Sequence, residues 1–274
     1  MKKVIKYLCL ACITLILLQS CDKEEFEDNN FIRNDFIKSE VSNDKVISKY
    51  KYNDIGKISE TEGLYFFNRY FYNNDGKLIN SETAADLSLL YSSLPIEKTE
   101  LMTNENSTIS SRQIFKYDEN GNLSEIENYF IKDNEFELRS KQSFEFVNGK
   151  IARRNLHNEK GKVTQFNVYE YDTKGNVKNE KYYSFLFSES TESRLISENS
   201  FKYDNKKNPF IIFNELGNPG LYTNQNNVIE EKTIRHEETT GFDKNSTSKT
   251  SYEYNRNSFP TKVITENSEY EYKY

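Results

Sequence analysis

Hydrophobic and polar residues alternate along this chain in a short unit that recurs many times. In the stretch 50–58, Tyr50 and Tyr52 flank a lysine, a polar turn follows, and Gly56 precedes the aliphatic Ile58. Side chains at i and i+2 share one face of a β-strand, so the two aromatic rings point the same way. Asp or Asn then caps a tight turn, and Gly supplies a positive φ. The unit therefore predicts a β-hairpin.

Imperfect copies of this unit fill residues 45–274, the region that we expect to fold as one β domain. The other aromatic pairs begin at Tyr70, Phe115, Phe144, Tyr169, Phe201, Tyr252 and Tyr270. A turn without its aromatic half lies at 158–163. We expect the recurrent turn residues to be structural, namely Asp54, Gly56, Gly76, Asp118, Gly121, Gly149, Gly161, Asp172, Gly175 and Asp204.

The stretch 135–146 shows the alternation most clearly. Its even-numbered positions carry Phe and Leu, interrupted by Ser140 and Gln142, while its odd-numbered positions are mostly charged. This pattern is typical of an antiparallel strand with one water-facing side. The chain is therefore predicted to be all-β, an antiparallel meander of long β-hairpins forming a strongly curved or barrel-like sheet. A lipid-facing strand would need an unbroken apolar face, so we expect a soluble sheet on a tether.

Two stretches depart from the hairpin pattern. Residues 81–94 place apolar side chains at helical spacing after Ser81, so a short helix is predicted near 82–94, where it would plug an open end of the sheet. Residues 210–227 form a long segment with Gly, Pro and an Asn-rich end. A loop of this length inside regular hairpins is either functional or a lid over the core, and both interpretations stay open.

The N-terminal residues 1–20 are interpreted as a signal peptide. Lys2, Lys3 and Lys6 give the chain a basic start. The apolar run 4–18 is too short for a comfortable transmembrane helix. The run ends in Leu18-Gln19-Ser20-Cys21, which resembles the lipobox cut by bacterial lipoprotein signal peptidase. The small residue before the cut admits the peptidase, and the Cys21 thiol is the nucleophile that takes a diacylglycerol. The alternative is a plain secretory signal or an N-terminal anchor helix.

Cleavage before Cys21 would remove the other two cysteines, which excludes a disulfide framework and a cysteine metal site. Residues 21–44 are predicted to be a lipidated cysteine and an acidic tether. Lys23-Glu24-Glu25 resembles the signal that directs some Gram-negative lipoproteins to the cell surface, whereas Asp22 directly after the cysteine is typical of inner-membrane retention. We favour an outer-membrane, lipid-anchored protein that faces the cell exterior.

Composition narrows the possible functions. The 274 residues include 20 Tyr, 19 Phe and no Trp, with only 35% hydrophobic residues, so aromatic side chains must supply much of the core. The formal net charge of −6 becomes −9 without the signal peptide, because that peptide carries three lysines and no acid. An acidic chain is a poor candidate for binding phosphate backbones, so no nucleic-acid partner is expected.

Residues with catalytic or metal-binding chemistry are sparse. His157 and His236 lie in separate copies with no paired ligand nearby, and no HExxH, P-loop, GxGxxG or GxSxG motif occurs. Asp118, Asp172 and Asp204 recur at the turn position, where aspartate has a structural role, so their recurrence argues against catalysis. We therefore expect no enzyme activity, no cofactor and no metal.

The hairpin unit resembles the YD repeats of the RHS family, whose core is aromatic-x-Tyr-Asp-x-x-Gly-x-Leu. The whole arrangement is more similar to the YD-repeat-like surface lipoproteins with a porin-like β fold, in which a lipobox and an acidic spacer precede degenerate hairpins. The resemblance covers about residues 45–274 and includes Asn208-Pro209 and Phe259-Pro260. An RHS-style toxin shell is not expected, since the very long repeat array and a toxin domain after the last repeat are lacking.

These observations predict a non-enzymatic surface lipoprotein that acts as a binding or scaffold module. Its expected partners are the membrane, through the lipid on Cys21, and a glycan or a protein at the cell surface. One alternative is a glycan-binding or polysaccharide-processing accessory protein, and another is a purely structural envelope protein. The inward placement of the aromatics and the lack of Trp favour core packing over sugar stacking for most of these rings.

Overall fold

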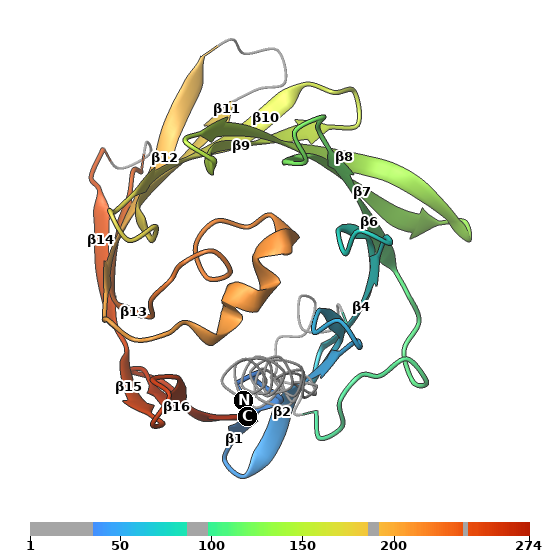
Figure 1. Cartoon of the computed structure of the whole chain (residues 1–274). Helices are drawn as coiled ribbons and strands as arrows, with labels where there is room; N and C mark the ends of the chain where they lie inside the picture. The colour runs from blue at the N-terminus through green and yellow to red at the C-terminus, as the bar shows by residue number, and fades with distance from the viewer. Residues whose placement is uncertain (1–34, 87–97, 186–191, 238–240) are drawn as a thin grey trace, which may run out of the picture. The chain divides into compact units, whose positions relative to one another are not determined.

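The computed structural model describes residues 35–86, 98–185, 192–237 and 241–274, all within one compact unit, Asp35–Tyr274. This unit is an antiparallel sheet that curves into a nearly closed ring, seen along its axis in Figure 1. The predicted signal peptide 1–20, Cys21 and the acidic run that follows it lie outside the described residues.

The first strands of the sheet are β1 (Ser39–Ser42), β2 (Lys45–Tyr52), β3 (Ile58–Gly63), β4 (Phe66–Tyr72), β5 (Leu78–Ala85), β6 (Ser111–Tyr117), β7 (Leu123–Lys132), β8 (Glu135–Val147) and β9 (Lys150–Asn158). The remaining strands are β10 (Val163–Tyr171), β11 (Val177–Phe185), β12 (Ser193–Tyr203), β13 (Val228–Arg235), β14 (Lys244–Lys249), β15 (Ser251–Tyr254), β16 (Pro260–Ile264) and β17 (Glu269–Lys273). A 3-10 helix, η1 (Pro209–Leu216), lies between β12 and β13.

Strands that follow one another in the sequence are neighbours in the sheet. Each consecutive pair from β1 to β14 forms an antiparallel ladder, as do β15 with β16 and β16 with β17. The first and last strands meet, because β1 pairs with β17 as well as with β2. Between β14 and β15 the chain continues through Thr250, whose N–H donates to the Ile229 carbonyl (3.1 Å). The predicted all-β meander with a barrel-like sheet is confirmed.

The turn between β6 and β7 shows why the repeated unit folds as a hairpin. The N–H of Asp118 donates to the Asn122 carbonyl and the N–H of Gly121 donates to the Asp118 carbonyl, each at 2.9 Å. The Asp118 carboxylate also accepts the N–H groups of Asn120 (2.9 Å) and Asn122 (2.8 Å). Gly121 has a φ of 81°, which is strained for residues with a side chain. Every one of these determinants is local in the sequence.

Four other predicted glycines, namely Gly56, Gly76, Gly161 and Gly175, occupy the same turn position, whereas Gly149 lies in a two-residue turn with Asn148. A positive φ is adopted by Gly56, Gly76, Gly149, Gly161 and Gly175. In the first hairpin the side chain that accepts the Lys57 N–H (2.9 Å) is Asn53, and Asp54 is the next residue of the same turn. Asn53 directly follows the aromatic pair, which is the place that Asp118 occupies in its own hairpin.

The second tyrosine of an aromatic pair joins its hairpin to the preceding one. The Tyr117 hydroxyl donates to the carbonyl of Leu78 (2.8 Å), the aliphatic residue that begins the preceding return strand. The same bond connects Tyr171 to Ile151 and Tyr203 to Val177, and Tyr274, two residues after the last aromatic pair, donates in the same way to Pro260. A buried phenol needs a hydrogen-bond partner, and these carbonyls supply it. The pairs therefore pack inward and also bond one hairpin to the next.

The predicted helix near 82–94 is wrong for residues 82–85, the part of it that the structure describes as strand. Residues 78–85 form β5, which pairs with β4 on one side and β6 on the other. Glu82 lies between Arg69 and Arg112, and both guanidinium groups contact its carboxylate at 2.6 Å. These cross-strand partners outweigh the helical spacing. The apolar residues 87–94 of that pattern lie outside the described residues.

The folded unit starts before the predicted residue 45. Strand β1 pairs on both sides, and Ile37 is fully buried in the core. The Ile37 carbonyl also accepts the Tyr52 hydroxyl (2.7 Å). The stretch 35–44, which the sequence pattern assigns to the tether, is therefore part of the ring.

One hairpin carries an insertion that enters the ring. The N–H of Asp204 donates to the Asn227 carbonyl (3.1 Å), and the N–H of Asn227 donates to the Asp204 carboxylate (3.1 Å). Asp172 and Asn176 form the same two bonds, both at 2.9 Å, across a short turn. Residues 205–226, called the plug from here on, are thus inserted within an ordinary turn. Figure 1 shows the plug in orange inside the ring.

The plug packs aromatic side chains against the wall. Phe210 (7% exposed) and Phe213 (4% exposed) lie on η1 and join a core cluster with Ile58, Val263 and Tyr272. The sequence left open whether the stretch 210–227 is a lid or a functional loop. In the structure it is an internal plug that shares its core with the wall.

Asparagine side chains hold the backbone of the plug. The wholly buried Asn176 accepts the N–H groups of Gln225 (2.8 Å) and Asn226 (3.0 Å) through Oδ1. In return, Asn224 Oδ1 accepts the N–H of Val177 (2.8 Å). Buried backbone groups need partners, and an amide offers both a donor and an acceptor. This requirement explains the Asn-rich end of the insertion.

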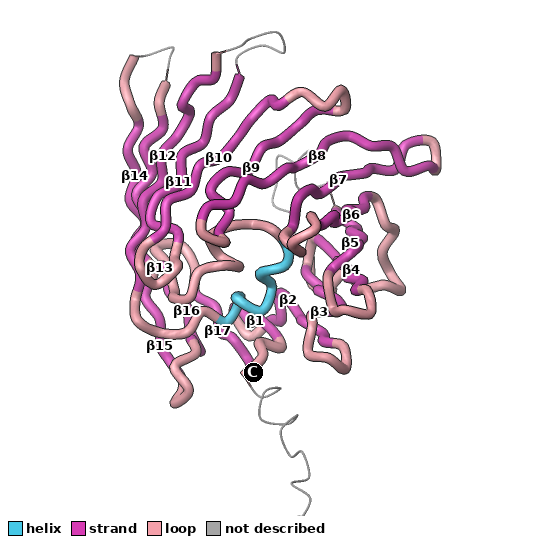
Figure 2. The backbone as a smooth tube through the Cα atoms, turned by 45° about the horizontal axis from the view of Figure 1, so that its top comes forward, coloured by secondary structure: helices cyan, strands magenta, loops and turns pink. Residues whose placement is uncertain are grey.

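Strands β7 to β14 rise above the rest of the ring as a tall wall, shown in Figure 2. On the outer face, Glu127 of β7 lies between two lysines of the neighbouring strands. Lys116 on β6 contacts its carboxylate at 2.7 Å, and Lys141 on β8 contacts it at 2.8 Å. Tyr129 donates its hydroxyl to the same carboxylate (3.0 Å). The hydrogen bond from Lys116, followed by that from Lys141, lowers the pKa of Glu127 to about 2.

Replacing Glu127 with glutamine should lower the free energy of unfolding at pH 7 by about 1 kcal/mol, a modest loss because both lysines are partly exposed. The pKa is depressed from 4.5 to about 2 in the folded state. The carboxylate therefore stabilises fully above about pH 4.5, and this contribution fades as the pH falls towards 2. Urea denaturation at pH 7 and pH 3 measures it. Glu119→Gln, at an exposed turn, is the control, and an equal loss at both pH values for Glu127→Gln would contradict the ion-pair account.

Candidate functional site

A polar pocket lies on the inner face of strands β8 to β11. Its cavity of about 340 Å³, called the inner pocket, is lined by Gln142, Arg154, Leu156, Gln165, Asn167 and Tyr182. Cross-strand pairing puts these residues on one face, because Gln142 lies opposite Leu156, and Asn167 lies opposite both Arg154 and Tyr182. This face is the inner one, since Arg154 reaches Asn218 of the plug.

Arg154 is held by the plug and the wall together. Its Nη1 donates to Asn218 Oδ1 (2.7 Å), and its Nη2 donates to Asn167 Oδ1 (3.4 Å). Asn167 Nδ2 donates in turn to Glu180 Oε1 (2.8 Å). A guanidinium has five N–H donors in one plane, so donors remain for an oxygen atom of a ligand. The orientation of these donors is set before any ligand arrives.

Three other side chains of the inner pocket have polar groups to spare. Within the described part of the chain, the amides of Gln142 and Gln165 and the hydroxyl of Tyr182 make no hydrogen bond. All three residues are half-buried. Half-buried polar groups without a protein partner are open to water or to a ligand, and three of them converge on this one cavity, which makes it a candidate site for a polar ligand. The two amides can donate and accept, and the Tyr182 ring offers an apolar face.

Two carboxylates lie further along the same inner face. Glu180 on β11 and Glu231 on β13 face inward, because their cross-strand partners Tyr169 and Phe201 belong to inward aromatic pairs. Burial, and after it the charge of Glu180, raises the pKa of the Glu231 carboxyl. A carboxyl with a raised pKa near a second acid can act as a proton donor.

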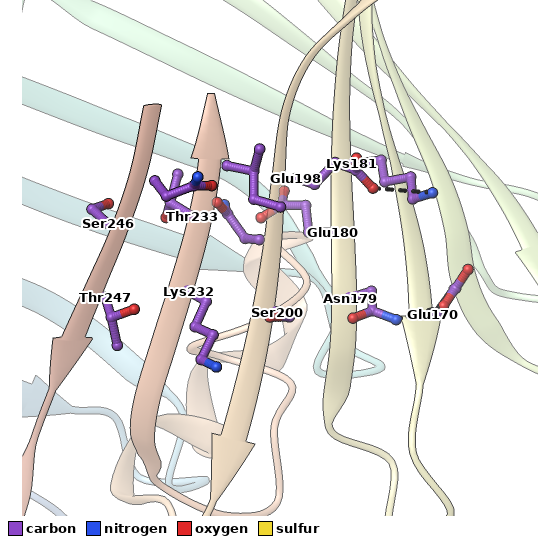
Figure 3. Close-up of a pocket in the computed structure, with 13 residues that line it drawn as sticks. Glu170, Asn179, Glu180, Lys181, Glu198, Ser200, Lys232, Thr233, Ser246 and Thr247 are labelled. Carbon is purple, nitrogen blue, oxygen red and sulfur yellow. Dashed lines mark hydrogen bonds and ion pairs between the residues drawn. The ribbon is translucent and has the colours of Figure 1, made fainter. Parts of the chain in front are cut away.

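A second hollow lies on the outer face of the tall wall, across β10 to β14. This cavity of about 430 Å³, called the outer furrow, is shown in Figure 3. One row of polar side chains crosses its strands, made of Glu170, Asn179, Ser200, Lys232 and Thr247. These positions alternate with the inward aromatic pairs, so they face outward. Asn179 donates to Glu170 (2.7 Å), and Lys181 contacts Glu198 (3.1 Å).

The turn residues singled out in the sequence are spread around the ring. Asp118, Asp172 and Asp204 each accept hydrogen bonds from the backbone of their own turn. Hydrogen bonds from the backbone and then the side chain of Asn122 lower the pKa of the Asp118 carboxyl. None of the three lines the inner pocket or the outer furrow.

The two histidines lie apart on the outer face. The Nε2 of His157 is 2.8 Å from Ser143 Oγ, and His236 lies between Asp243 (2.9 Å) and Glu198 (3.3 Å). In the residues that the structure describes, no three His, Cys, Asp or Glu side chains are grouped to hold a metal ion. No helix in that same part of the chain has the length and apolar character needed to cross a bilayer.

The sequence pattern does not predict the inner pocket, although one signal is visible. Ser140 and Gln142 interrupt the apolar face of the stretch 135–146, as polar residues lining a cavity would. The pattern leaves open which of Arg153 and Arg154 faces inward. Which arginine faces inward depends on a register shift between β8 and β9 at Phe146, and that shift becomes visible only in the paired strands.

The sequence matches no protein-family model and no curated protein. Among solved structures, a porin-like protein from Bacteroides vulgatus matches over 87% of this chain and 98% of its own, with 11% identity and a TM-score of 0.39. A porin-like protein from Bacteroides uniformis matches over 87% and 97%, with 11% identity and a TM-score of 0.36. A DUF3836 family protein from Bacteroides vulgatus matches over 48% and 91%, with 13% identity and a TM-score of 0.23. Likeness at this level carries no inference about activity or ligand.

Proposed function

We propose that this chain is a non-enzymatic, lipid-anchored binding module of the outer membrane, displayed on the cell surface, that captures a glycan in its inner pocket. The lipobox ending at Cys21 supports the anchor, and Lys23-Glu24-Glu25 supports surface display. The recurring hairpin unit supports kinship with the YD-repeat-like surface lipoproteins. No nucleic-acid partner is proposed for so acidic a chain.

The outer wall of the ring favours a barrel that stands in water on its tether. Ion pairs cover this face, with Glu82 between Arg69 and Arg112 and Glu127 between Lys116 and Lys141. A lipid-facing barrel wall carries apolar side chains outward, and charged side chains there are destabilising. In this chain the aromatic pairs instead point inward. The wall thus has the polarity of a soluble barrel, and the lipid would supply the membrane attachment.

The observation that carries the glycan proposal is the set of unpartnered groups in the inner pocket. The amides of Gln142 and Gln165 can each donate to one sugar hydroxyl and accept from another. Arg154 adds fixed donors, and the Tyr182 ring can pack against the apolar face of a pyranose. Arg154 is the one charged residue in this lining, and the neutral amides and the hydroxyl around it suit the hydroxyl groups of a saccharide.

Removing the Tyr182 hydroxyl should weaken glycan binding about threefold to tenfold, the usual contribution of one hydrogen bond. The full chain, purified in detergent, would be screened on a glycan array, and the best ligand would then be titrated by calorimetry against Tyr182→Phe and Gln165→Ala. The matched control is Tyr183→Phe. Tyr183 is the next residue on β11, but it faces outward and stacks on Phe166 (4.7 Å between ring centroids). The Tyr183→Phe variant should therefore bind the glycan like the unaltered chain.

Two outcomes would overturn the proposal. One is an array on which the folded chain captures no glycan. The other is a ligand whose affinity is unchanged in both Tyr182→Phe and Gln165→Ala, because that ligand would bind elsewhere. Capture of a peptide or protein in place of a glycan would favour the scaffold alternative.

A second candidate, glycoside hydrolysis, is favoured by the acids Glu180 and Glu231 on the inner face. Burial and the Glu180 charge favour the protonated form of Glu231, as a general acid requires. A reducing-end assay on any glycan that the chain binds separates the two functions. New reducing ends that disappear in Glu231→Gln would establish hydrolysis, and intact glycan would leave capture alone.

A further inference from the structure

Three lysines surround one glutamate on the outer face of β12 to β14. Lys202 contacts Glu230 at 2.9 Å from the neighbouring strand, and Lys232 contacts it at 3.8 Å along its own strand. Lys249 is the cross-strand partner of Glu230 on β14. All three lysines are exposed, whereas Glu230 is 17% exposed. We call these four residues the lysine group.

The lysine group adds positive charge to a negatively charged chain. One carboxylate cannot neutralise three ammonium groups, so the group has a net charge of about two positive units at neutral pH. The whole chain, by contrast, has a formal charge of −6. The positive excess is therefore confined to this group, because the adjoining furrow carries the carboxylates of Glu170 and Glu198 beside Lys181.

The lysine group borders the outer furrow, and Lys232 belongs to both. Next to Lys232 in the polar row stand the hydroxyls of Ser200 and Thr247 and the amide of Asn179. Ser200 lies opposite Lys232 on one side and Thr247 lies opposite it on the other, so the row runs across the strands. Neighbouring strands are about 4.8 Å apart, which is close to the length of one sugar ring along a polysaccharide.

We propose that the outer furrow and the lysine group together bind an acidic polysaccharide, a chain of uronic acid units. Its carboxylates would pair with Lys202, Lys232 and Lys249, and its hydroxyls would bond to Ser200, Thr247 and Asn179. Three features support this assignment, namely the cavity lined by a row of polar side chains, the regular spacing of that row across the strands, and the local positive charge of the lysine group. The site is separate from the inner pocket, which lies on the other face of the wall.

A uronic acid polymer fits this surface better than a nucleic acid does. Duplex DNA carries one negative charge per about 1.7 Å of axis, and its binding needs many cations along a continuous track. On this face the carboxylates of Glu170 and Glu198 lie among the lysine side chains, so there is no continuous track of positive charge. A polymer with one carboxylate per sugar and several neutral hydroxyls between carboxylates avoids most of that repulsion.

The test uses the full chain in detergent and polygalacturonate as the probe, with dextran as the uncharged control. Binding to immobilised polygalacturonate should weaken about tenfold or more when Lys202, Lys232 and Lys249 are all replaced by serine, because three exposed ion pairs to the polymer are lost together. It should also weaken as salt is raised. The matched control replaces Lys132, Lys160 and Lys174, lysines on other parts of the ring, and should bind normally. Circular dichroism confirms that each variant is folded.

Glu230→Gln provides the opposite prediction, since removing the one acid of the lysine group should tighten binding. Equal binding of polygalacturonate by the triple serine variant and the unaltered chain would overturn the proposal, as would equal binding of dextran. Stronger binding of a single-stranded DNA oligonucleotide than of polygalacturonate would assign the surface to nucleic acid instead. Tyr182→Phe should leave polygalacturonate binding unchanged, so failure of the inner-pocket proposal would not be mistaken for failure of this one.

Discussion

Replacing Phe210 with alanine is expected to lower the free energy of unfolding by about 3–5 kcal/mol. Phe210 is 7% exposed and lies in the core cluster that joins the plug to the wall, with Ile37, Ile58 and Val263. Its ring also meets Tyr272 edge-on, with 5.5 Å between centroids. Truncation would remove this packing and leave a cavity between η1 and the strands. Urea denaturation, followed by circular dichroism, measures the loss.

The control for Phe210→Ala is Leu221→Ala, a truncation on the same plug. Leu221 is 55% exposed, so this change should cost no more than about 0.5 kcal/mol. The plug also orients Arg154 through Asn218, so Phe210→Ala should weaken ligand capture in the inner pocket as well. If Phe210→Ala and Leu221→Ala had the same small effect, the plug would not be part of the cooperative core.

Replacing Cys21 with alanine is expected to abolish fatty-acid labelling and release the chain from membranes. The reason is chemical, because the thiol of Cys21 is the proposed site of the diacylglycerol and alanine offers no nucleophile. Acyl chains attach a protein to a bilayer through the burial of their CH₂ groups, each contributing about 0.8 kcal/mol. Labelling with a radioactive or clickable fatty acid, followed by membrane fractionation, measures both effects.

Cys12→Ala is the matched control for Cys21→Ala, because Cys12 lies within the proposed signal peptide and should be removed with it. This variant should be labelled and retained like the unaltered chain. Protease treatment of intact cells tests the orientation, and the surface model expects the barrel to be digested. Unchanged membrane retention of Cys21→Ala would contradict the lipid anchor, and full protection from protease would contradict surface display.

The hairpins can be predicted from the sequence because their determinants lie within a few residues of one another. The Asp118 carboxylate, the Gly121 backbone and the aromatic pair before them act inside one turn. The segment around Glu82 shows the limit of local reasoning. Its helical spacing is real, but Arg69 and Arg112 approach from neighbouring strands, and those partners are remote in the sequence.

The insertion after Asp204 shows a second limit. In the sequence this copy has lost its turn glycine and runs into Asn208-Pro209. In the structure the turn is intact, because Asn227 supplies the bonds that Asn176 supplies in the neighbouring hairpin. A pattern search with a fixed spacing cannot find a partner displaced by an insertion. The pairing becomes visible only when both strands are in register.

The amino-acid sequence by itself determines the repeated hairpin, the inward direction of the aromatic pairs and the candidate lipobox, since each depends on short-range chemistry. Tertiary structure alone decides that the meander closes through β1 and β17, that the insertion lies inside the ring, and that Arg154 meets Gln142 and Tyr182 at one cavity. Those outcomes depend on register shifts at the bulges and on contacts between residues far apart in the chain. A shift of one residue turns every side chain of a strand to the other face, so the inner pocket and the outer furrow exist only once the register is set.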